Sequence, residues 1–135
     1  MSGGFWRIVV ALVILAHGIG HVLFLAPCLG FTQWGSPAHS WLLTRALGDA
    51  PTRVIGSLLW LVVIAGFMAA GVGLLGQYGW WRTLAVASAG VSLLALVLFL
   101  NGGQVQPVLS AALMDVAILV ALLLVHWPAV DLVGA

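Results

Sequence analysis

The chain has 135 residues, of which 64% are hydrophobic and only 5% are charged, and its formal net charge is +1. Soluble domains are about 45–50% apolar and about 25% charged, so this composition, with a mean hydropathy of +1.25, excludes a soluble globular fold and indicates an integral membrane protein. The charge balance provides no basic surface for a nucleic acid. The single cysteine, Cys28, excludes an internal disulfide and a CxxC motif. The length fits one membrane domain over residues 1–135.

The first apolar stretch, at about residues 5–26, is long enough to cross roughly 30 Å of hydrocarbon as a helix. Arg7 followed by this apolar run also resembles a secretory signal, and LAPC at 25–28 resembles a lipoprotein cleavage box. However, Pro27 stands where such a box needs a small residue, and two histidines interrupt the apolar run. We therefore expect a membrane-spanning helix that Pro27 closes.

The only long connection follows, at residues 27–52, and it contains a short amphipathic segment. We expect a helix within SPAHSWLLTRALG, with Ser36 as its N-cap and Gly48 as its terminator. Its apolar side chains would dip into the membrane while Arg45 faces headgroups or water. The sequence thus predicts an interfacial helix across one mouth of the bundle, either as a plain connector or as a gating lid.

Three further apolar stretches lie at about 53–76, 80–100 and 107–127. Asp49, in GDAP at 48–51, is expected to cap the first of them. Every backbone amide in a bilayer core must bond within its own segment, and the stretches lack the alternation of a barrel strand, so helices are the only candidate. The predicted fold is all-α: a polytopic membrane protein with four transmembrane helices in an antiparallel bundle.

Helix contacts in lipid are expected along small residues, because lipid supplies no hydrophobic drive for association. Such residues on the second and third stretches are Gly66, Ala69, Ala70, Gly73, Ala85, Ser88, Ala89 and Ser92. Tryptophans near predicted helix ends suggest an aromatic belt at the two interfaces. These tryptophans are Trp6, Trp60, Trp80, Trp81 and Trp127.

Four crossings place both termini on one side of the membrane, with two arginines on each side. We expect the termini in the cytoplasm and the chain in a bacterial inner (cytoplasmic) membrane, with the lipid bilayer as its main partner. The small-residue stripes could also serve a homo-oligomer or contact a larger membrane complex.

His17 and His21, in ILAHGIGHVLF, lie one turn apart on the same helix face. An imidazole in hydrocarbon needs a polar partner, and Asp115 is the one carboxylate deep inside a predicted helix. Counting at 1.5 Å per residue from the helix ends on one side, His21, Asp115 and His17 lie at depths of roughly 8, 12 and 14 Å. If the first and last helices pack together, the three residues form one intramembrane polar cluster.

Polar residues at the loops on the same side would form a mouth above this cluster. They are Asp49, Arg53, Asn101, Gln104 and Gln106. Gly18 and Gly20 flank the histidine face and would let a neighbouring helix or a ligand approach closely. His126 lies at the opposite end of the last helix and is not included in the site.

Four interpretations of the His17, His21 and Asp115 cluster remain open: a hydrogen-bonded clasp that fixes the first and last helices, a metal or haem site, a quinone site, and a path for protons or ions. Two histidines four residues apart cannot bind one haem iron from opposite faces. Thiol catalysis by Cys28 with His39 has no geometric support, and no phosphate loop, HExxH or GxSxG motif occurs. The residues do not decide whether the protein is an enzyme.

The set AHGIGH, GDAPTRVIG, Trp60, the WW pair at 80–81 and Asp115 resembles an uncharacterised group of small bacterial four-helix membrane proteins. This resemblance brings no established activity. In size and topology the chain is also similar to DoxX-like proteins, one of which is a small subunit associated with quinone-linked sulfur oxidation. That second resemblance implies a quinone connection. Two functions follow as hypotheses: a redox or proton site that holds a metal, haem or quinone, or a non-catalytic accessory subunit.

Overall fold

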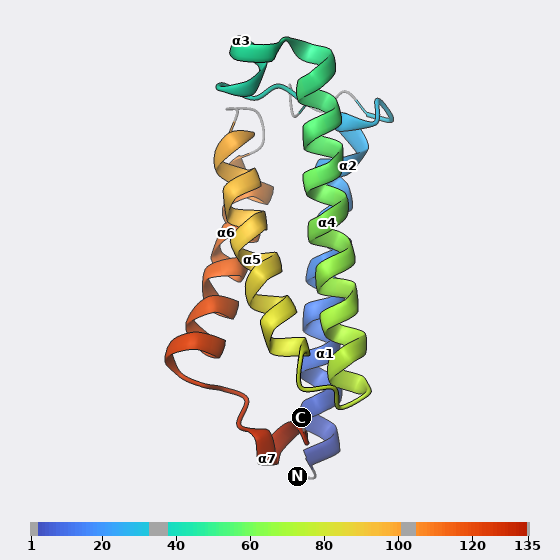
Figure 1. Cartoon of the computed structure of the whole chain (residues 1–135). Helices are drawn as coiled ribbons and strands as arrows, with labels where there is room; N and C mark the ends of the chain where they lie inside the picture. The colour runs from blue at the N-terminus through green and yellow to red at the C-terminus, as the bar shows by residue number, and fades with distance from the viewer. Residues whose placement is uncertain (1–2, 33–37, 101–104, 135) are drawn as a thin grey trace.

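The computed structural model describes residues 3–32, 38–100 and 105–134. Within these ranges the chain is helical and contains no strand. Four helical stretches are long and apolar enough to cross a membrane, and they run alongside one another (Figure 1). Their bounds are Gly4–Cys28, Asp49–Leu75, Trp81–Leu98 and Val105–Leu124. The all-helical fold with four candidate spans is therefore confirmed.

The first stretch consists of two helices, α1 (Gly3–Gly20) and α2 (Val22–Cys28), which meet at His21. The His21 amide donates to the Gly18 carbonyl at 3.2 Å. This bond reaches back three residues instead of the four of an α-helix, so the turn is locally tighter. The prediction that Pro27 closes this helix is wrong, because Pro27 lies inside α2. A Schellman motif closes it instead, with Gly30 in the left-handed region at φ +83°.

The loop after α2 contains a shorter helix than expected, α3 (Leu43–Leu47). The expected N-cap, Ser36, lies outside the described residues. Two side chains before α3 bond to carbonyl groups at the C-terminal end of α5 (Trp81–Leu98), where the last carbonyls lack α-helical partners. The bonds are Ser40 Oγ to Leu98 O and Trp41 Nε1 to Val97 O. The segment before α3 is thus tied to the end of α5.

The longest helix, α4 (Asp49–Leu75), begins four residues earlier than the sequence predicts. Its N-cap is Gly48, whose φ of +86° also ends α3 as expected. Asp49 therefore does not cap the helix: it lies in the first turn, where its charge complements the helix dipole. The early start is compatible with Pro51, because the first turn of a helix does not need the amide that proline lacks.

Helices α4 and α5 pack closely through small residues, as expected. Ala70, Ala85 and Ala89 are fully buried, and a Cβ added at Gly66 would collide with the Ser88 hydroxyl. The aromatic-belt prediction is wrong for Trp60 and Trp81, whose side chains are buried in the core. Proximity to a predicted helix end does not separate an interfacial tryptophan from one that points inward.

The last stretch is α6 (Val105–Leu119), followed by a π-helical segment, η1 (Val120–Leu124), that the sequence did not indicate. The last stretch ends at Leu124, three residues earlier than predicted. A short helix, α7 (Val130–Val133), then packs on α1 near both chain ends (Figure 1). Helix α6 packs mainly on α5 and contacts α1 much less than α4 does. The interface between α1 and α6 is therefore looser than the interfaces of α4 with α1, of α4 with α5 and of α5 with α6.

Candidate functional site

The structure brings His17 of α1 and Asp115 of α6 into direct contact. Their atoms His17 Nε2 and Asp115 Oδ1 lie 2.7 Å apart, as the depth count predicts. Asp115 is completely buried, and the His17 side chain is 9% exposed. With Asp115 ionised, the carboxylate accepts and His17 Nε2 carries the proton. This bond spans the loose interface between α1 and α6.

The second carboxylate oxygen of Asp115 is the unusual atom of this pair. Oδ2 is buried and has no hydrogen-bond partner among the described residues. Leaving a polar atom unbonded in an apolar interior costs roughly 1–3 kcal/mol, and more when the group is charged. A cation or a hydrogen-bond donor beside Asp115 Oδ2 would therefore be stabilising.

His21 is fixed at the break between α1 and α2 by both of its ring nitrogens. Nδ1 lies 2.9 Å from the His17 carbonyl, and Nε2 lies 2.8 Å from Ser92 Oγ on α5. A carbonyl only accepts, so Nδ1 carries the proton and Nε2 accepts from the Ser92 hydroxyl. The lone pair of His21 is therefore on Nε2.

This pattern disfavours a continuous proton path through both histidines. The hydrogen bond between them runs from the His21 ring to the backbone carbonyl of His17 and does not reach the His17 ring. A backbone carbonyl cannot pass a proton onward as an imidazole can. The same pattern, in which one ring nitrogen bonds a carbonyl and the other presents its lone pair, is typical of metal-binding histidines.

Aromatic side chains support the two imidazoles from α4. The Phe67 ring meets His17 edge-on, with 4.8 Å between centroids, and stacks on His21 at 5.7 Å. Gly18 makes this possible, because a Cβ there would lie 2.8 Å from the Cβ of Phe67. Gly20 differs: no atom would lie within 4 Å of its Cβ. The expected close helix approach is thus observed at Gly18 alone.

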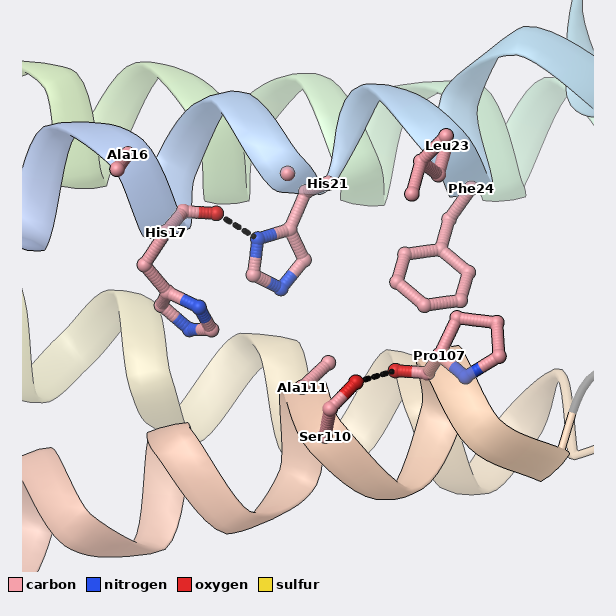
Figure 2. A pocket seen from close by; sticks show the side chains of 9 residues that line it. Ala16, His17, His21, Leu23, Phe24, Pro107, Ser110 and Ala111 are labelled. Carbon is pink, nitrogen blue, oxygen red and sulfur yellow. Dashed lines mark hydrogen bonds between the residues drawn. The ribbon is translucent and has the colours of Figure 1, made fainter.

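A pocket of about 220 Å³ lies beside the histidines, between α1, α2 and α6 (Figure 2). Its lining is mostly apolar and consists of Ala16, His17, Gly20, His21, Leu23, Phe24, Pro107, Ser110 and Ala111. The Ser110 hydroxyl bonds to carbonyls of its own helix. The pocket is smaller than the roughly 300–1,000 Å³ of typical ligand sites, so it is too small to enclose a haem.

The three predicted residues are also arranged as metal ligands could be. One potential ligand atom from each of His17, His21 and Asp115 lies within 4.8 Å of the other two. Two imidazoles and a carboxylate suit first-row transition metals. Three protein ligands also leave at least one coordination position open, as in catalytic sites.

The predicted mouth is not part of this pocket. Asp49 and Arg53 line a second pocket that shares none of its described lining residues with the first. Asn101 and Gln104 lie outside the described residues, whereas Gln106 lies in α6. His126 is exposed, and its one hydrogen bond among the described residues is to Leu124 O of its own turn, consistent with its omission from the site.

Sequence reasoning missed Ser92, which it treated only as a packing residue. Ser92 lies six residues before the end of α5, or roughly 9 Å, which is close to the depth of His21. Depth counting applied to hydroxyl groups as well as to ionisable groups could have found it. The Phe67 contact had no comparable signal, because an apolar ring in an apolar helix does not show which neighbour it faces.

No family model, curated protein or solved structure matches the chain. The fold and site therefore define only a class: an all-helical protein with four helices that could cross a membrane and a buried group of two histidines and one aspartate. The function has to be inferred from the geometry of this group.

Proposed function

We propose that this is an integral membrane protein whose four long helices form an antiparallel bundle, with α3 at the membrane interface, and that it binds a first-row transition metal ion. The ligands are His17, His21 and Asp115. The observation that carries the proposal is the convergence of their ligand atoms within 4.8 Å, beside a buried carboxylate oxygen that has no partner among the described residues.

Charge supports a cation at this position. An ionised carboxylate inside a bilayer is expensive, and one hydrogen bond from a neutral imidazole offsets only part of that cost. A divalent ion supplies the missing positive charge. His21 contributes the lone pair on Nε2, which its Nδ1 bond to the His17 carbonyl orients.

Metal binding has to replace two hydrogen bonds of the metal-free protein. The proton on His17 Nε2 has to move to Nδ1 of the same ring when Nε2 and the Asp115 carboxylate become ligands, so that the imidazole stays neutral, and Ser92 releases His21 Nε2. The ligand atoms lie within 4.8 Å of one another, and a tetrahedral ion with bonds of about 2.0–2.2 Å would draw them to about 3.3–3.6 Å, so side-chain shifts of about 1 Å are needed. The neighbouring pocket provides room for a small reactant at the open coordination position, which fits redox or proton chemistry.

The proposed setting is a bacterial inner membrane with both chain ends in the cytoplasm. A C-terminal reporter that is active only in the cytoplasm tests it. Activity supports the orientation, and activity seen only with an exported reporter contradicts it.

A second function has an observation of its own. The hydrogen bond between His17 and Asp115 forms without any ligand, and it joins α1 to α6, two helices that otherwise make few contacts. This favours a clasp in a non-catalytic accessory subunit. A quinone headgroup in the pocket is a third outcome, because His17 and Ser110 line it.

The test uses protein purified in detergent, stripped with a chelator and then titrated with Zn²⁺ or Co²⁺. We expect one ion per chain, with visible Co²⁺ absorption, and loss of both in His17→Ala and Asp115→Ala. His126→Ala and His39→Ala are matched controls that should keep the ion, because both residues are exposed and lie outside the cluster.

Several results would contradict the metal proposal. If the wild type takes up no ion while Asp115→Asn only lowers thermal stability, the cluster is a clasp. A visible band in protein purified without added metal would indicate a haem. Ions that bind equally to wild type and His17→Ala would place the metal elsewhere.

A further inference from the structure

A second pocket lies where α2 ends beside the first three turns of α4, and it is independent of the histidine cluster. Its volume is about 600 Å³. Its lining combines one basic and one acidic side chain with uncharged ones: Cys28, Leu29, Asp49, Ala50, Arg53, Val54, Ser57 and Leu58. The metal proposal does not involve this pocket.

Arg53 is positioned by the backbone of the loop after α2. Its Nε donates to the Cys28 carbonyl at 3.1 Å, and a Cβ at Gly30 would lie 2.8 Å from its Nη2. Among the described residues, neither terminal nitrogen of the guanidinium makes a hydrogen bond. The group is therefore held in place with donors that remain free for a ligand.

Asp49 lies one turn before Arg53 on α4, in the arrangement that normally gives an ion pair. No such pair occurs: the only described charged partner of Asp49 is His39, at 3.8 Å, and the Asp49 side chain is 83% exposed. The pocket thus holds a positive and a negative group that do not neutralise each other. Their Cβ atoms are about 5–6 Å apart on the helix surface.

The length of α4 places these charges at the level of lipid headgroups. Its 27 residues extend over roughly 40 Å, whereas the hydrocarbon core is about 30 Å thick. The first turn of α4 therefore reaches into the headgroup layer. Val54 and Leu58 continue the same pocket toward the hydrocarbon.

We propose that this pocket binds a zwitterionic phospholipid with a primary amine in its headgroup, of the phosphatidylethanolamine type. The phosphate accepts hydrogen bonds from Arg53, the ammonium donates to Asp49, and an acyl chain lies along Val54 and Leu58. A quaternary choline has no N–H to donate to Asp49, and a purely anionic headgroup meets an unfavourable carboxylate.

The experiment equilibrates the full chain in detergent with equimolar phosphatidylethanolamine, phosphatidylcholine and phosphatidylglycerol that carry identical acyl chains. Lipid retained by the purified protein is then quantified by mass spectrometry. We expect phosphatidylethanolamine to be enriched about fivefold over each of the other two lipids, which is the affinity ratio that one exposed ion pair can provide. Arg53→Gln should lose the enrichment, whereas Arg45→Gln, which changes an arginine outside the pocket, should keep it.

Asp49→Asn provides a second test that does not depend on the folding of Arg53→Gln. It should shift the preference from phosphatidylethanolamine to phosphatidylglycerol, because the repulsive carboxylate is gone. Equal retention of the three lipids by the wild type, or a preference for phosphatidylglycerol, would overturn the proposal. Binding of inorganic phosphate by a wild type that retains none of the three lipids would show that the site binds free phosphate and not a lipid.

Discussion

The interface between α4 and α5 and the interface between α1 and α6 are built in opposite ways. The first is closed by small residues, to the point that Gly66 has no room for a Cβ against Ser88. The second is bridged by one polar pair, His17 with Asp115, and has pockets of about 220 and 210 Å³ along it. The interface between α4 and α5 therefore stabilises the fold, whereas the interface between α1 and α6 leaves space for a ligand.

Energetics in lipid support the same division. Hydrogen bonds between transmembrane helices contribute on average about 0.6 kcal/mol, because the unfolded chain in the membrane also finds polar partners. Steric overlap in a close-packed interface costs more, about 1–3 kcal/mol. We therefore expect substitutions between α4 and α5 to affect stability most, and substitutions in the cluster to affect ligand binding most.

The largest loss of stability is expected for Gly66→Leu. The new side chain cannot be placed without moving Ser88 or separating the helices, so unfolding should become easier by about 3 kcal/mol. Thermal unfolding in detergent, followed by circular dichroism, measures this. Gly90→Leu is the matched control, because a Cβ at Gly90 meets no atom within 4 Å. Equal destabilisation by both variants would contradict the close-packed description.

A smaller loss is expected for Gly18→Ala, about 1–2 kcal/mol, because its Cβ would press on Phe67. Phe67 supports both imidazoles, so metal uptake should fall as well. Gly20→Ala, two residues away on the same helix, has open space and should leave stability nearly unchanged. If Gly20→Ala proves the more damaging of the two, the break at His21 depends on glycine conformation and not on helix approach.

Asp115→Asn tests the polar interface itself. An asparagine still accepts a hydrogen bond from His17, so stability should fall by only about 1 kcal/mol. The Zn²⁺ affinity should fall at least about tenfold, because the charged ligand is lost. Stability is measured after chelation and affinity by titration. A loss of stability as large as that of Gly66→Leu would show that the cluster is mainly a clasp.

The smallest effect is expected for Ser92→Ala, and its sign is informative. The hydroxyl competes with a metal for His21 Nε2, so its removal should raise Zn²⁺ affinity roughly threefold, the ratio that corresponds to about 0.6 kcal/mol. The metal-free variant should be less stable by a similar amount. Ala89→Gly, a nearby change in the same buried face, should not raise affinity. Unchanged affinity in Ser92→Ala would mean that Nε2 is not a ligand.

Some local features of the fold can be predicted from the sequence, and others cannot. The glycine that ends α3 was predicted at Gly48, because the helix stop is a local property of one residue. The sequence predicts the end of α2 at Pro27, whereas Gly30 determines it, because both residues are stop signals and the hydrogen bonds decide between them. The sequence also predicts Trp60 at an interface, whereas Trp60 packs against Phe24 in the core.

The sequence by itself determined the helical class, the four candidate spans and the matching heights of two histidines and one aspartate along their helices. These follow from hydrophobicity, length and a fixed rise per residue, which do not depend on the neighbours of a helix. Only the tertiary structure decided that Asp115 bonds His17 while His21 turns to Ser92, and that Asp49 and Arg53 line a separate pocket. The rotation of each helix about its axis and its choice of neighbour set these contacts, and both depend on packing over the whole bundle.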